Sequence, residues 1–324
     1  MTCFDLSMEM DPVLPRTFSD TMHRALVPIW MVLLLMTSLV TGPSYAQEGP
    51  SVGESDAPLR LMSYNIRFDN PAEEGSPIAW DARRDRVASV IRFHRPAILG
   101  TQEGLLHQLM DLEDRIPDYE WVGVGRRSGG GEFTAVFYRP DRVDLLAHDT
   151  FWLSATPNEP GSTGWDAALP RVATWARFRD RQSGDTLAVV NTHFDHAGPE
   201  ARRKSARLIA QFLPRITKGD PAVVMGDLNA KPDTPPIEAL LEADTEVSLL
   251  DARTASVTLH HGPTSTFNNF RPEVLPDRRI DYVFVSESVR VRRHGHLSER
   301  WNGQFPSDHL PVFVEVTVPE ERSD

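Results

Sequence analysis

Six short polar motifs lie at intervals along most of the chain. Five of them follow apolar runs that read as buried strands, and the sixth stands at the start of one. Polar residues at the ends of buried strands are where α/β scaffolds usually hold binding and catalytic groups. No single motif is specific, so the argument depends on all six together. They are Met62-Ser63-Tyr64-Asn65, Thr101-Gln102-Glu103, Asn191-Thr192-His193, Gly226-Asp227-Leu228-Asn229, Arg279-Ile280-Asp281-Tyr282 and Ser307-Asp308-His309.

The carboxylate and amide side chains of two motifs suit a bound divalent cation. Glu103 is the best candidate for a metal ligand, and Asn65 can bind or orient the same ion. Mg²⁺ fits such a site because it prefers hard oxygen ligands, and Mn²⁺ can substitute for it. No tight cluster of histidine and cysteine is apparent along the chain, so Zn²⁺ is the poorer choice. The alternative for Glu103 alone is an acidic side chain that stabilises the start of a helix.

Asp227 and Asn229 lie two residues apart and therefore project from the same side of an extended segment. A carboxylate at this place can orient a water molecule, and an amide can bind the oxyanion that develops on a phosphate. The alternative is an Asx turn after the strand, which the nearby Pro232 favours. The turn and the site are compatible, so both remain open.

Two histidines stand close to carboxylates or strand ends in the sequence. His309 follows Asp308, and Asp281 lies at the head of an earlier strand. A histidine oriented by a carboxylate acts as a general base with a fixed tautomer. His193 closes an apolar run that also carries Asn191, so we expect both at the substrate, where His193 could bind phosphate or protonate the leaving group. A structural histidine before an apolar strand is the alternative for His309.

The glycine-rich stretch at residues 123–131 could be mistaken for a phosphate-binding loop. It lacks the Gly-Lys-Ser/Thr ending of a nucleotide P-loop and opens no helix. A flexible loop between two strands is the better interpretation. Arg126 and Arg127 on that loop could still contact an anionic substrate.

The apolar pattern predicts the elements that position these residues. Helices are expected where apolar residues recur with a helical period, over Asp81–His94, Leu105–Leu112 and Ala201–Leu213. Strands with helices after only some of them indicate a mixed α/β sandwich and not a repeating barrel. The predicted strands are Leu59–Tyr64, Ala97–Leu99, Trp121–Val124, Phe133–Tyr138, Val143–Thr150, Val172–Phe178, Leu187–Asn191, Ala222–Met225, Ile280–Val285, Val289–His294 and Pro311–Val318.

Residues 1–46 have the pattern of a secretory signal peptide. An apolar run, Leu26–Met36, follows His23-Arg24 and precedes Ser44-Tyr45-Ala46, which suits cleavage before Gln47. Translation from Met22 would remove an acidic stretch that does not suit such a signal. The protein is therefore expected to be secreted or periplasmic. The alternative is a membrane anchor formed by an uncleaved signal, although the run is short for a membrane span.

One domain, over residues 58–318, is expected after a flexible lead-in at residues 47–57 and before a tail at residues 319–324. A site assembled from motifs at both ends of the chain requires the two halves to pack together. The only cysteine, Cys3, lies in the predicted signal, so the mature chain can form no disulfide.

The charge balance narrows the range of partners. The chain carries a formal net charge of −12, and four acidic and two basic side chains leave with residues 1–46, so the mature chain carries −10. A net acidic surface argues against tight, non-specific binding of long nucleic acid. No exposed apolar hairpin suited to a membrane surface is apparent, and after signal cleavage no stable membrane partner is expected. Nothing in the sequence implies an oligomer.

Taken together and in order, the motifs resemble those of the endonuclease/exonuclease/phosphatase superfamily, which includes deoxyribonuclease I. The resemblance covers Leu59 to Val318. It implies an α/β (α+β) fold with four layers, in which two mixed β-sheets pack face to face and are flanked by helices. By the same resemblance, Asn65, Glu103 and Asp308 would hold Mg²⁺.

The resemblance also implies roles for the remaining motif residues. Asp227 and Asn229 would orient the attacking water and stabilise the transition state. Asp281 would hold His309, and His193 would contact the scissile phosphate. The implied activity is Mg²⁺-dependent hydrolysis of a phosphoester by an activated water, with a phosphodiester of a nucleic acid, a nucleotide or a small molecule favoured. The alternatives are a phosphomonoesterase acting on sugar or inositol phosphates and, in another class, a binding module without activity.

Residues 151–157 and 161–171 resemble a secreted bacterial branch of the superfamily that is closest in sequence to the deadenylase-like exonucleases. Within this stretch, Arg171 could bind phosphate through its planar guanidinium, and Trp165 could stack on a base or sugar. Ordinary packing in the core or in a surface loop is the alternative for both residues.

Overall fold

A computed structural model describes residues 57–273 and 275–318. The chain divides into a unit Met1–Pro50, outside the described residues, and a unit Ser51–Asp324, which holds every described helix and strand. The predicted signal peptide, almost all of the predicted lead-in and the tail therefore lie outside the described residues. Within the described ranges, no helix is long and apolar enough to cross a membrane.

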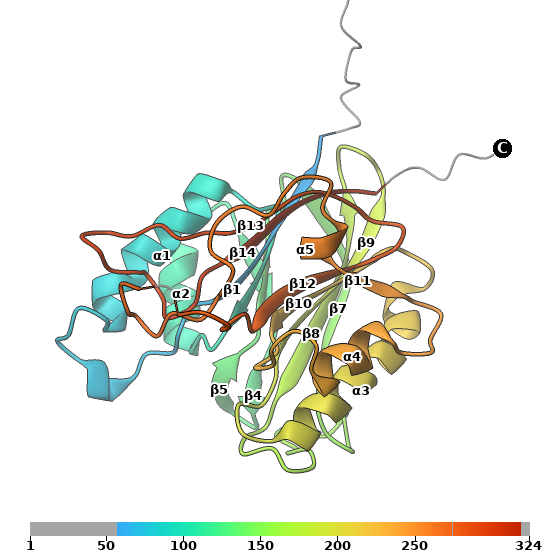
Figure 1. Cartoon of the computed structure of the whole chain (residues 1–324), viewed down its shortest axis with the longest axis horizontal. Coiled ribbons are helices and arrows are strands. Elements are labelled where there is room, and N and C mark those ends of the chain that lie inside the picture. The colour runs from blue at the N-terminus through green and yellow to red at the C-terminus, as the bar shows by residue number, and fades with distance from the viewer. Residues whose placement is uncertain (1–56, 274, 319–324) are drawn as a thin grey trace, which may run out of the picture. The chain divides into compact units, whose positions relative to one another are not determined.

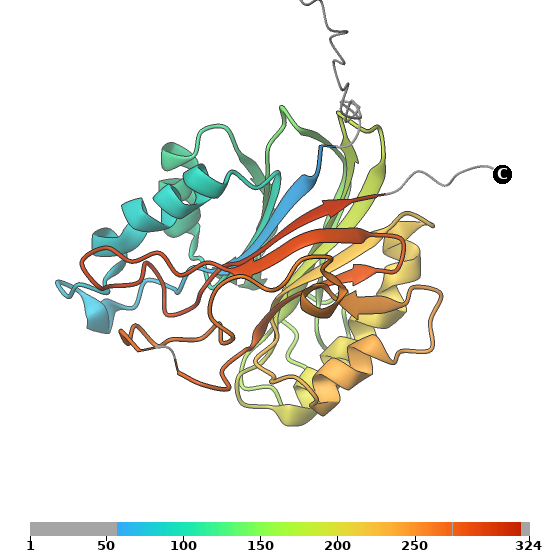
Figure 2. The same ribbon diagram turned by 45° about the horizontal axis from the view of Figure 1, so that its top comes forward.

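The first β-sheet is built from both ends of the domain. Its strands are β1 (Leu59–Asn65), β2 (Ile98–Gln102), β3 (Glu120–Val122), β6 (Val136–Tyr138), β13 (Arg290–His296) and β14 (Val312–Thr317). They lie in the order β13-β14-β1-β2-β6-β3. The first strand pairs with β2 in parallel and with β14 antiparallel, so the C-terminal strands, in red, lie beside the N-terminal strand, in blue (Figure 2).

The second β-sheet comes from one continuous stretch in the middle of the chain. Its strands are β7 (Val143–Trp152), β8 (Val172–Asp180), β9 (Thr186–His193), β10 (Ala222–Asp227), β11 (Leu249–Asp251) and β12 (Asp281–Ser286). Their order is β11-β12-β10-β9-β8-β7. A separate two-stranded ribbon joins β4 (Gly125–Arg127) to β5 (Gly130–Phe133).

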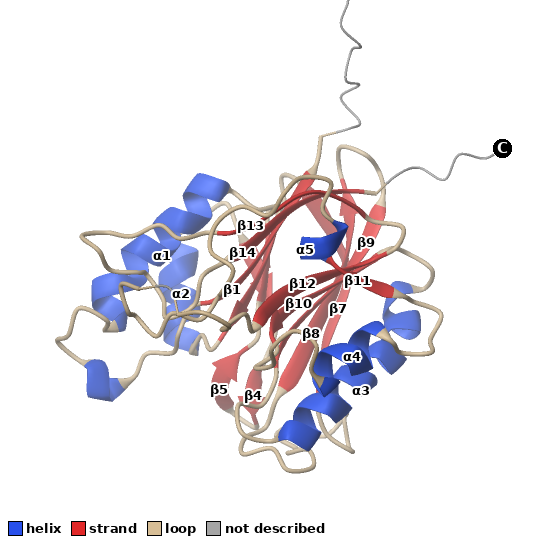
Figure 3. Ribbon diagram, viewed as in Figure 1, coloured by secondary structure: helices blue, strands red, loops and turns tan. Residues whose placement is uncertain are grey.

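Helices cover the outer faces of both sheets (Figures 1 and 3). They are α1 (Trp80–His94), α2 (Leu106–Arg115), α3 (Pro199–Thr217) and α4 (Pro235–Leu241). The short α5 (Ala252–Ala255) instead packs against the core between the two sheets. The first two helices share an apolar core with the first sheet, and α3 and α4 share one with the second sheet. A third core lies between the two sheets. The predicted four-layer sandwich is therefore confirmed.

Strand alternation explains why both sheets are buried on two faces. In β1, Leu61 belongs to the core between the sheets, whereas Met62 belongs to the core under α1 and α2. A strand buried on both faces reads as a continuous apolar run, which is why the sequence located most strands correctly. The left-handed backbone of Arg95 ends α1 directly before Pro96, as the predicted helix boundary requires.

Some elements differ from the sequence-based expectation. The predicted strand Phe133–Tyr138 divides into the end of β5 and β6, and the predicted flexible loop at residues 123–131 contains the β4–β5 ribbon. The elements α4, β11 and α5 were not predicted. They are short, so each carries too few apolar residues to show a period.

Candidate active site

Strand register brings the sequence motifs to one edge of the sandwich. In the second sheet, Asp227 at the end of β10 pairs with His193 at the end of β9 and with Asp281 at the start of β12. In the first sheet, Asn65 ends β1 in register with the end of β2, directly before Glu103. Because parallel strands end at the same edge of a sheet, the polar side chains that follow them collect there.

The backbone at Asp227 is shaped by the glycine before it. Gly226 has a φ of 148°, and a Cβ there would lie 1.9 Å from the carbonyl oxygen of Thr192, so only glycine fits. Asp227 Oδ1 accepts the backbone N–H of Asn229 at 2.9 Å, and Oδ2 accepts Nδ2–H of Asn65 at 3.0 Å. The Asx turn and the predicted site are therefore the same structural feature.

His309 is held by Asp281 through a buried hydrogen bond of 2.9 Å from Nδ1, and its Nε2 lies 3.8 Å from Asp227 Oδ2. Burial, the largest single effect, would lower the pKa of His309. The carboxylates of Asp281 and Asp227 outweigh burial and raise this pKa well above its ordinary value. His309 therefore carries two protons near neutral pH and is suited to donate to an anion. This differs from the expectation that His309 is the general base.

The pKa of the Asp227 carboxyl is also shifted, and burial is the main cause of this shift. Burial, followed by the charge of Asp281, raises the pKa of Asp227 to about 7, and the charge of His309 opposes the shift. A carboxyl whose pKa lies near the working pH is suited to accept a proton from water. Asp227 is thus the better base of the two residues.

His193 is a neutral hydrogen-bond donor in this arrangement. Arg171 Nη1 donates to His193 Nδ1 at 3.0 Å, so the ring hydrogen must be on Nε2, because a guanidinium cannot accept. Burial, and then the charges of Arg171 and Arg126, lower the pKa of His193 well below its ordinary value. The Nε2 atom lies 3.1 Å from Asn229 Nδ2, so two N–H groups stand side by side. Of the two roles predicted for His193, this geometry favours binding a phosphate oxygen.

Glu103 and Asn65 form the part of the site that suits a cation. Glu103 has a left-handed φ of 65°, a strained conformation that is typical of functional residues. Asn65 Nδ2 donates to Glu103 Oε1 and to Asp227 Oδ2, both at 3.0 Å, so the two N–H bonds of one amide group join two carboxylates. The Asn65 Oδ1 atom accepts the backbone N–H of Arg67 at 3.0 Å. As placed, Asn65 therefore orients the two carboxylates, while Glu103 offers oxygen to an ion.

The charges around Asp308 fit a divalent cation as well. Burial, together with the charge of Glu103, raises the pKa of Asp308. Burial would also raise the pKa of Glu103, but His309, the Asn65 amide and Arg67 outweigh it and lower this pKa. The Glu103 carboxylate therefore disfavours a charge on the buried Asp308, a cation between the two would offset this effect, and their oxygen donors suit Mg²⁺ or Mn²⁺. Glu103 and Asp308 are the residues that could hold it.

The site opens into a pocket of about 720 Å³. Glu103, Asp227, Asp308, His193 and His309 all line it. The remaining wall is rich in positive charge, which suits an anionic substrate. The cationic side chains that line the pocket are Arg67, Arg126, Arg127, Arg171, Lys231 and Arg278.

The substrate-binding role predicted for Asn191 is contradicted by the structure. Asn191 is completely buried between the sheets, and its Nδ2 donates to the carbonyl oxygens of Thr101 and Ala135 at 2.9 and 2.8 Å. Its Oδ1 accepts from Gln102 Nε2 at 2.7 Å. Every polar atom of the Asn191 side chain is therefore used to join one sheet to the other.

The other predicted substrate-binding residues differ in whether they line the pocket. Arg126 and Arg171 both line the pocket, although Arg126 is also paired with Glu132 through two hydrogen bonds of 2.7 Å. Trp165 does not line the pocket, and the Lys204 ammonium of α3 lies 5.6 Å from its ring centroid. The stacking role predicted for Trp165 therefore has no support, and a packing role fits its position.

Sequence reasoning missed Arg67, which lies between the two proposed metal ligands. Its Nη1 lies 3.9 Å from Glu103 Oε2, and its Nε lies 3.9 Å from Asp308 Oδ2. The buried guanidinium of Arg83 fixes the backbone here by donating to the Ile66 and Arg67 carbonyls. The available signal was position, since Arg67 follows the first motif by two residues.

The expectation that the chain has no tight histidine cluster is wrong. His260, His294 and His296 lie together, outside the residues that line the pocket. The sequence places His260 far from the other two, so only the folded chain reveals the cluster.

The order of these motifs and the geometry of the site are typical of one family of proteins. The model of the endonuclease/exonuclease/phosphatase family matches residues 62–309, from the first motif to the last, and the chain belongs to this family. The resemblance predicted from the motifs is thereby confirmed. Members of the family hydrolyse phosphoester bonds, so the chain is a phosphoester hydrolase.

Two solved bacterial structures are similar to this chain over nearly their whole length. An endonuclease/exonuclease/phosphatase family protein from Bacteroides thetaiotaomicron is 35% identical, covers 83% of this chain and 98% of its own, and has a TM-score of 0.78. A mannosyl-6-phosphatase from the same species is 37% identical, covers 80% and 99%, and has a TM-score of 0.75. The human Nocturnin catalytic domain with a bound sulfate anion is 21% identical, covers 81% and 94%, and has a TM-score of 0.63, so this likeness concerns the fold alone.

Proposed function

We propose that the protein is a divalent-metal-dependent phosphomonoesterase that acts on a small phosphorylated sugar. The observation that carries the proposal is the pocket, which joins the catalytic groups to a wall of cationic side chains. A terminal phosphate carries more negative charge than a diester and suits such a wall. The relative described as a mannosyl-6-phosphatase, at 37% identity, supports the same choice. The sequence alone had favoured a diester.

The roles of the residues follow from their protonation states. Asp227 accepts a proton from the attacking water as the new P–O bond forms. The N–H groups of His193 and Asn229 bind a phosphoryl oxygen, and the doubly protonated His309, held by Asp281, donates to another. The bond from phosphorus to the sugar oxygen breaks, and that oxygen takes a proton from solvent water, which releases inorganic phosphate and an alcohol. Asp227 then returns its proton to solvent. A divalent ion held at Glu103 and Asp308 would neutralise charge on the leaving oxygen.

A comparison of substrates tests the proposal. The purified protein is assayed with Mg²⁺ on mannose 6-phosphate and p-nitrophenyl phosphate, beside bis(p-nitrophenyl) phosphate and a short oligonucleotide. We expect kcat/KM on the sugar monoester to exceed that on either diester at least tenfold. A preference for the diesters would overturn the proposal and restore the phosphodiesterase hypothesis. His309→Ala is the control for contaminating phosphatase, because its activity should be lost on every substrate.

We further propose Mg²⁺ as the physiological metal, with Mn²⁺ as a substitute, because the donor atoms offered by Glu103 and Asp308 are oxygens. Removal of metal by EDTA should abolish turnover, and addition of Mg²⁺ or Mn²⁺ should restore it. Turnover that persists in EDTA would argue for a different chemistry.

Export is also a proposal, supported by the apolar run Leu26–Met36 and the small residues before Gln47. Sequencing the N-terminus of the protein recovered outside the cytoplasm tests it. A mature chain that begins at Gln47 supports cleavage, whereas retention of residues 26–36 in a membrane fraction supports the signal-anchor alternative.

A further inference from the structure

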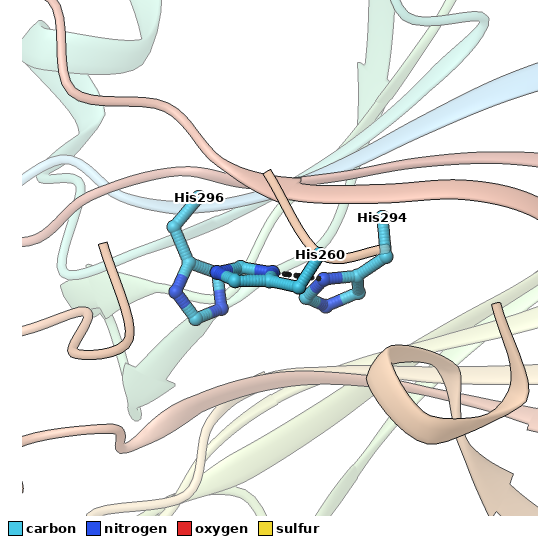
Figure 4. Close-up of side chains that lie close together, drawn as sticks. All are labelled: His260, His294 and His296. Atoms are coloured by element: carbon cyan, nitrogen blue, oxygen red, sulfur yellow. Dashed lines mark hydrogen bonds between the residues drawn. The ribbon is translucent and has the colours of Figure 1, made fainter. Parts of the chain in front are cut away.

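Three histidines gather at the first sheet, on residues that do not line the active-site pocket. His294 and His296 lie two residues apart on β13 and therefore project from the same face of the strand. His260 comes from the segment that follows α5. Figure 4 shows the three rings facing one another, with His260 between the other two.

The backbone of the His260 segment is fixed to β13. His261 N–H donates to the His294 carbonyl at 3.0 Å, and His296 N–H donates to the His261 carbonyl at 2.9 Å. Gly262 has a φ of 87°, and a Cβ there would lie 2.1 Å from the His296 carbonyl oxygen, so this approach requires glycine. The cluster is therefore held by paired backbone as well as by side chains.

Hydrogen bonds to one carbonyl fix the tautomers of two rings. The Pro263 carbonyl accepts from His260 Nε2 at 2.9 Å and from His296 Nδ1 at 2.7 Å. The lone pairs of these two rings are therefore on His260 Nδ1 and His296 Nε2. His260 Nδ1 lies 2.9 Å from His294 Nδ1, so the latter carries the hydrogen and His294 Nε2 is left with a lone pair.

Two of these nitrogens lack any partner although they are buried. His294 is 2% exposed and His296 is 0% exposed, and the Nε2 atom of each makes no hydrogen bond. A buried polar atom without a partner costs free energy, and such atoms are rare in native structures. Two unpartnered lone pairs in one cluster fit a ligand that accepts electron pairs, such as a metal ion.

We propose that His260, His294 and His296 bind a transition-metal ion of the Zn²⁺ class, at a site separate from the oxygen-lined active site. One nitrogen of each ring lies within 4.8 Å of one from each of the others. A tetrahedral ion with bonds of about 2.1 Å needs its ligand nitrogens roughly 3.3 Å apart, so the rings would turn toward the ion and the His260–His294 hydrogen bond would give way to metal bonds. Three imidazoles without a carboxylate suit Zn²⁺, Co²⁺ or Ni²⁺ and do not suit Mg²⁺.

The second shell of such a site is already in place. Metal-binding histidines usually donate their other N–H to a carbonyl, as His260 and His296 donate to Pro263. Part of His260 is exposed, which gives an ion a path to the cluster, and a water would complete its four ligands.

The position of the cluster indicates a structural role for the ion. Thr266 lies three residues after Pro263, and its Oγ1 accepts the backbone N–H of Asp281 at 3.1 Å. The Thr266 carbonyl accepts the backbone N–H of Leu310 at 2.7 Å, directly after His309. An ion at the cluster would therefore anchor the segment that supports the Asp281–His309 pair.

Cobalt spectroscopy on the full-length protein tests the proposal. The protein is stripped with chelator, supplied with saturating Mg²⁺ to fill the oxygen-lined site, and titrated with Co²⁺. We expect one equivalent to give the strong visible absorption of a four-coordinate, nitrogen-ligated ion, and Zn²⁺ to remove that absorption by displacement. The absorption should persist in Glu103→Gln, which lacks a ligand of the other site.

Variants of adjacent histidines supply the matched control. His260→Gln should abolish the Co²⁺ absorption, and His261→Gln, which changes an exposed neighbour outside the cluster, should leave it intact. His260 lies on a partly exposed segment, so its variant is expected to fold. Zn²⁺ should raise the melting temperature of the wild type and of His261→Gln by several degrees, but not that of His260→Gln. Equal Co²⁺ binding in both variants, or none in the wild type, would overturn the proposal.

Discussion

At the scale of single residues, Asp227 is the most constrained side chain of the site. Asn65 and the Asn229 backbone donate to it, and both His193 and His309 lie within 4 Å. Burial raises its pKa to about 7, which means that the fold disfavours its charged form. A carboxyl that is held in this way is consistent with the base role proposed for it.

We therefore predict opposite effects of Asp227→Asn on activity and stability. Loss of the base should lower kcat by about 10²–10⁴-fold. The melting temperature should stay the same or rise, because a neutral amide replaces a buried carboxyl that disfavours its charge. Steady-state kinetics and thermal denaturation measure the two effects. Activity within tenfold of the wild type would show that Asp227 is not the base.

Arg171 is predicted to act on the substrate through His193. Arg171→Met removes the donor to Nδ1 and one of the charges that lower the pKa of His193. We expect kcat/KM to fall roughly 10–100-fold, as for other groups that orient a working histidine. The pKa of His193, followed by NMR, should rise. Arg127→Met is the control, because it removes a pocket charge with no contact to His193, and an equal pKa change there would refute this role.

At the scale of elements, Gly100 and Asn191 join the two sheets. A Cβ on Gly100 of β2 would lie 2.6 Å from Asn191 Oδ1, so alanine would displace the Asn191 amide from the Thr101 and Ala135 carbonyls. Gly100→Ala should therefore lower the free energy of unfolding by about 2–4 kcal/mol.

Denaturant unfolding in a double-mutant cycle checks this mechanism. In an Asn191→Ala background the clash disappears, so the added cost of Gly100→Ala should become much smaller. Purely additive costs would mean that the two residues act independently.

The sequence predicted which residues lie at the strand ends of the site, but it did not predict what lies opposite them in the fold. Apolar runs located the strand ends, and with them Asp227, His193 and Glu103, because a strand buried on both faces has few polar residues before its end. Asn191 was assigned wrongly because it shares a strand face with His193. The opposite sheet covers this face at Asn191 but not at His193. How far that sheet extends cannot be predicted from the local sequence.

The histidine cluster could not be predicted for a related reason. The residues His294 and His296 suggest a shared strand face, but the expected strand ended at His294. Their partner His260 is separated from them by more than thirty residues and reaches them only through the backbone pairing of His261 with β13. Such a pairing between a loop and a strand has no sequence signature comparable to helical periodicity.

At the scale of the whole molecule, the buried histidines make stability depend on pH when metal is absent. Burial, followed by Arg279 and His260, lowers the pKa of His294 to about 3. Burial and the neighbouring histidines lower the pKa of His296 to about 2. The other charged groups that act on these rings are Arg253, which lowers the pKa of His294, and Asp251, which raises it.

In chelator, the protein should lose stability as the pH falls from about 7 to about 5. Below about 6.5 the unfolded chain binds protons that the folded chain excludes, so each histidine contributes a loss of up to about 1.4 kcal/mol per pH unit. Two groups oppose this loss: Asp227, whose raised pKa of about 7 lets the folded chain take up a proton over the same range, and His309, whose raised pKa has the same effect until the unfolded ring is protonated below about 6.5. Unfolding at several pH values measures the slope, and His296→Gln should make it shallower. An unchanged slope would contradict the assignment.

The order of strands also determines when activity can appear during synthesis. The second sheet is one continuous stretch, from β7 to β12, and can pair as soon as it leaves the ribosome. The first sheet remains open until β14, near the C-terminus, takes its place between β13 and β1. Because Asp308 and His309 directly precede β14, a nascent chain lacks part of its active site until the last strand of the domain is made. Hydrolytic activity is therefore expected only after the last strand of the domain has been synthesised.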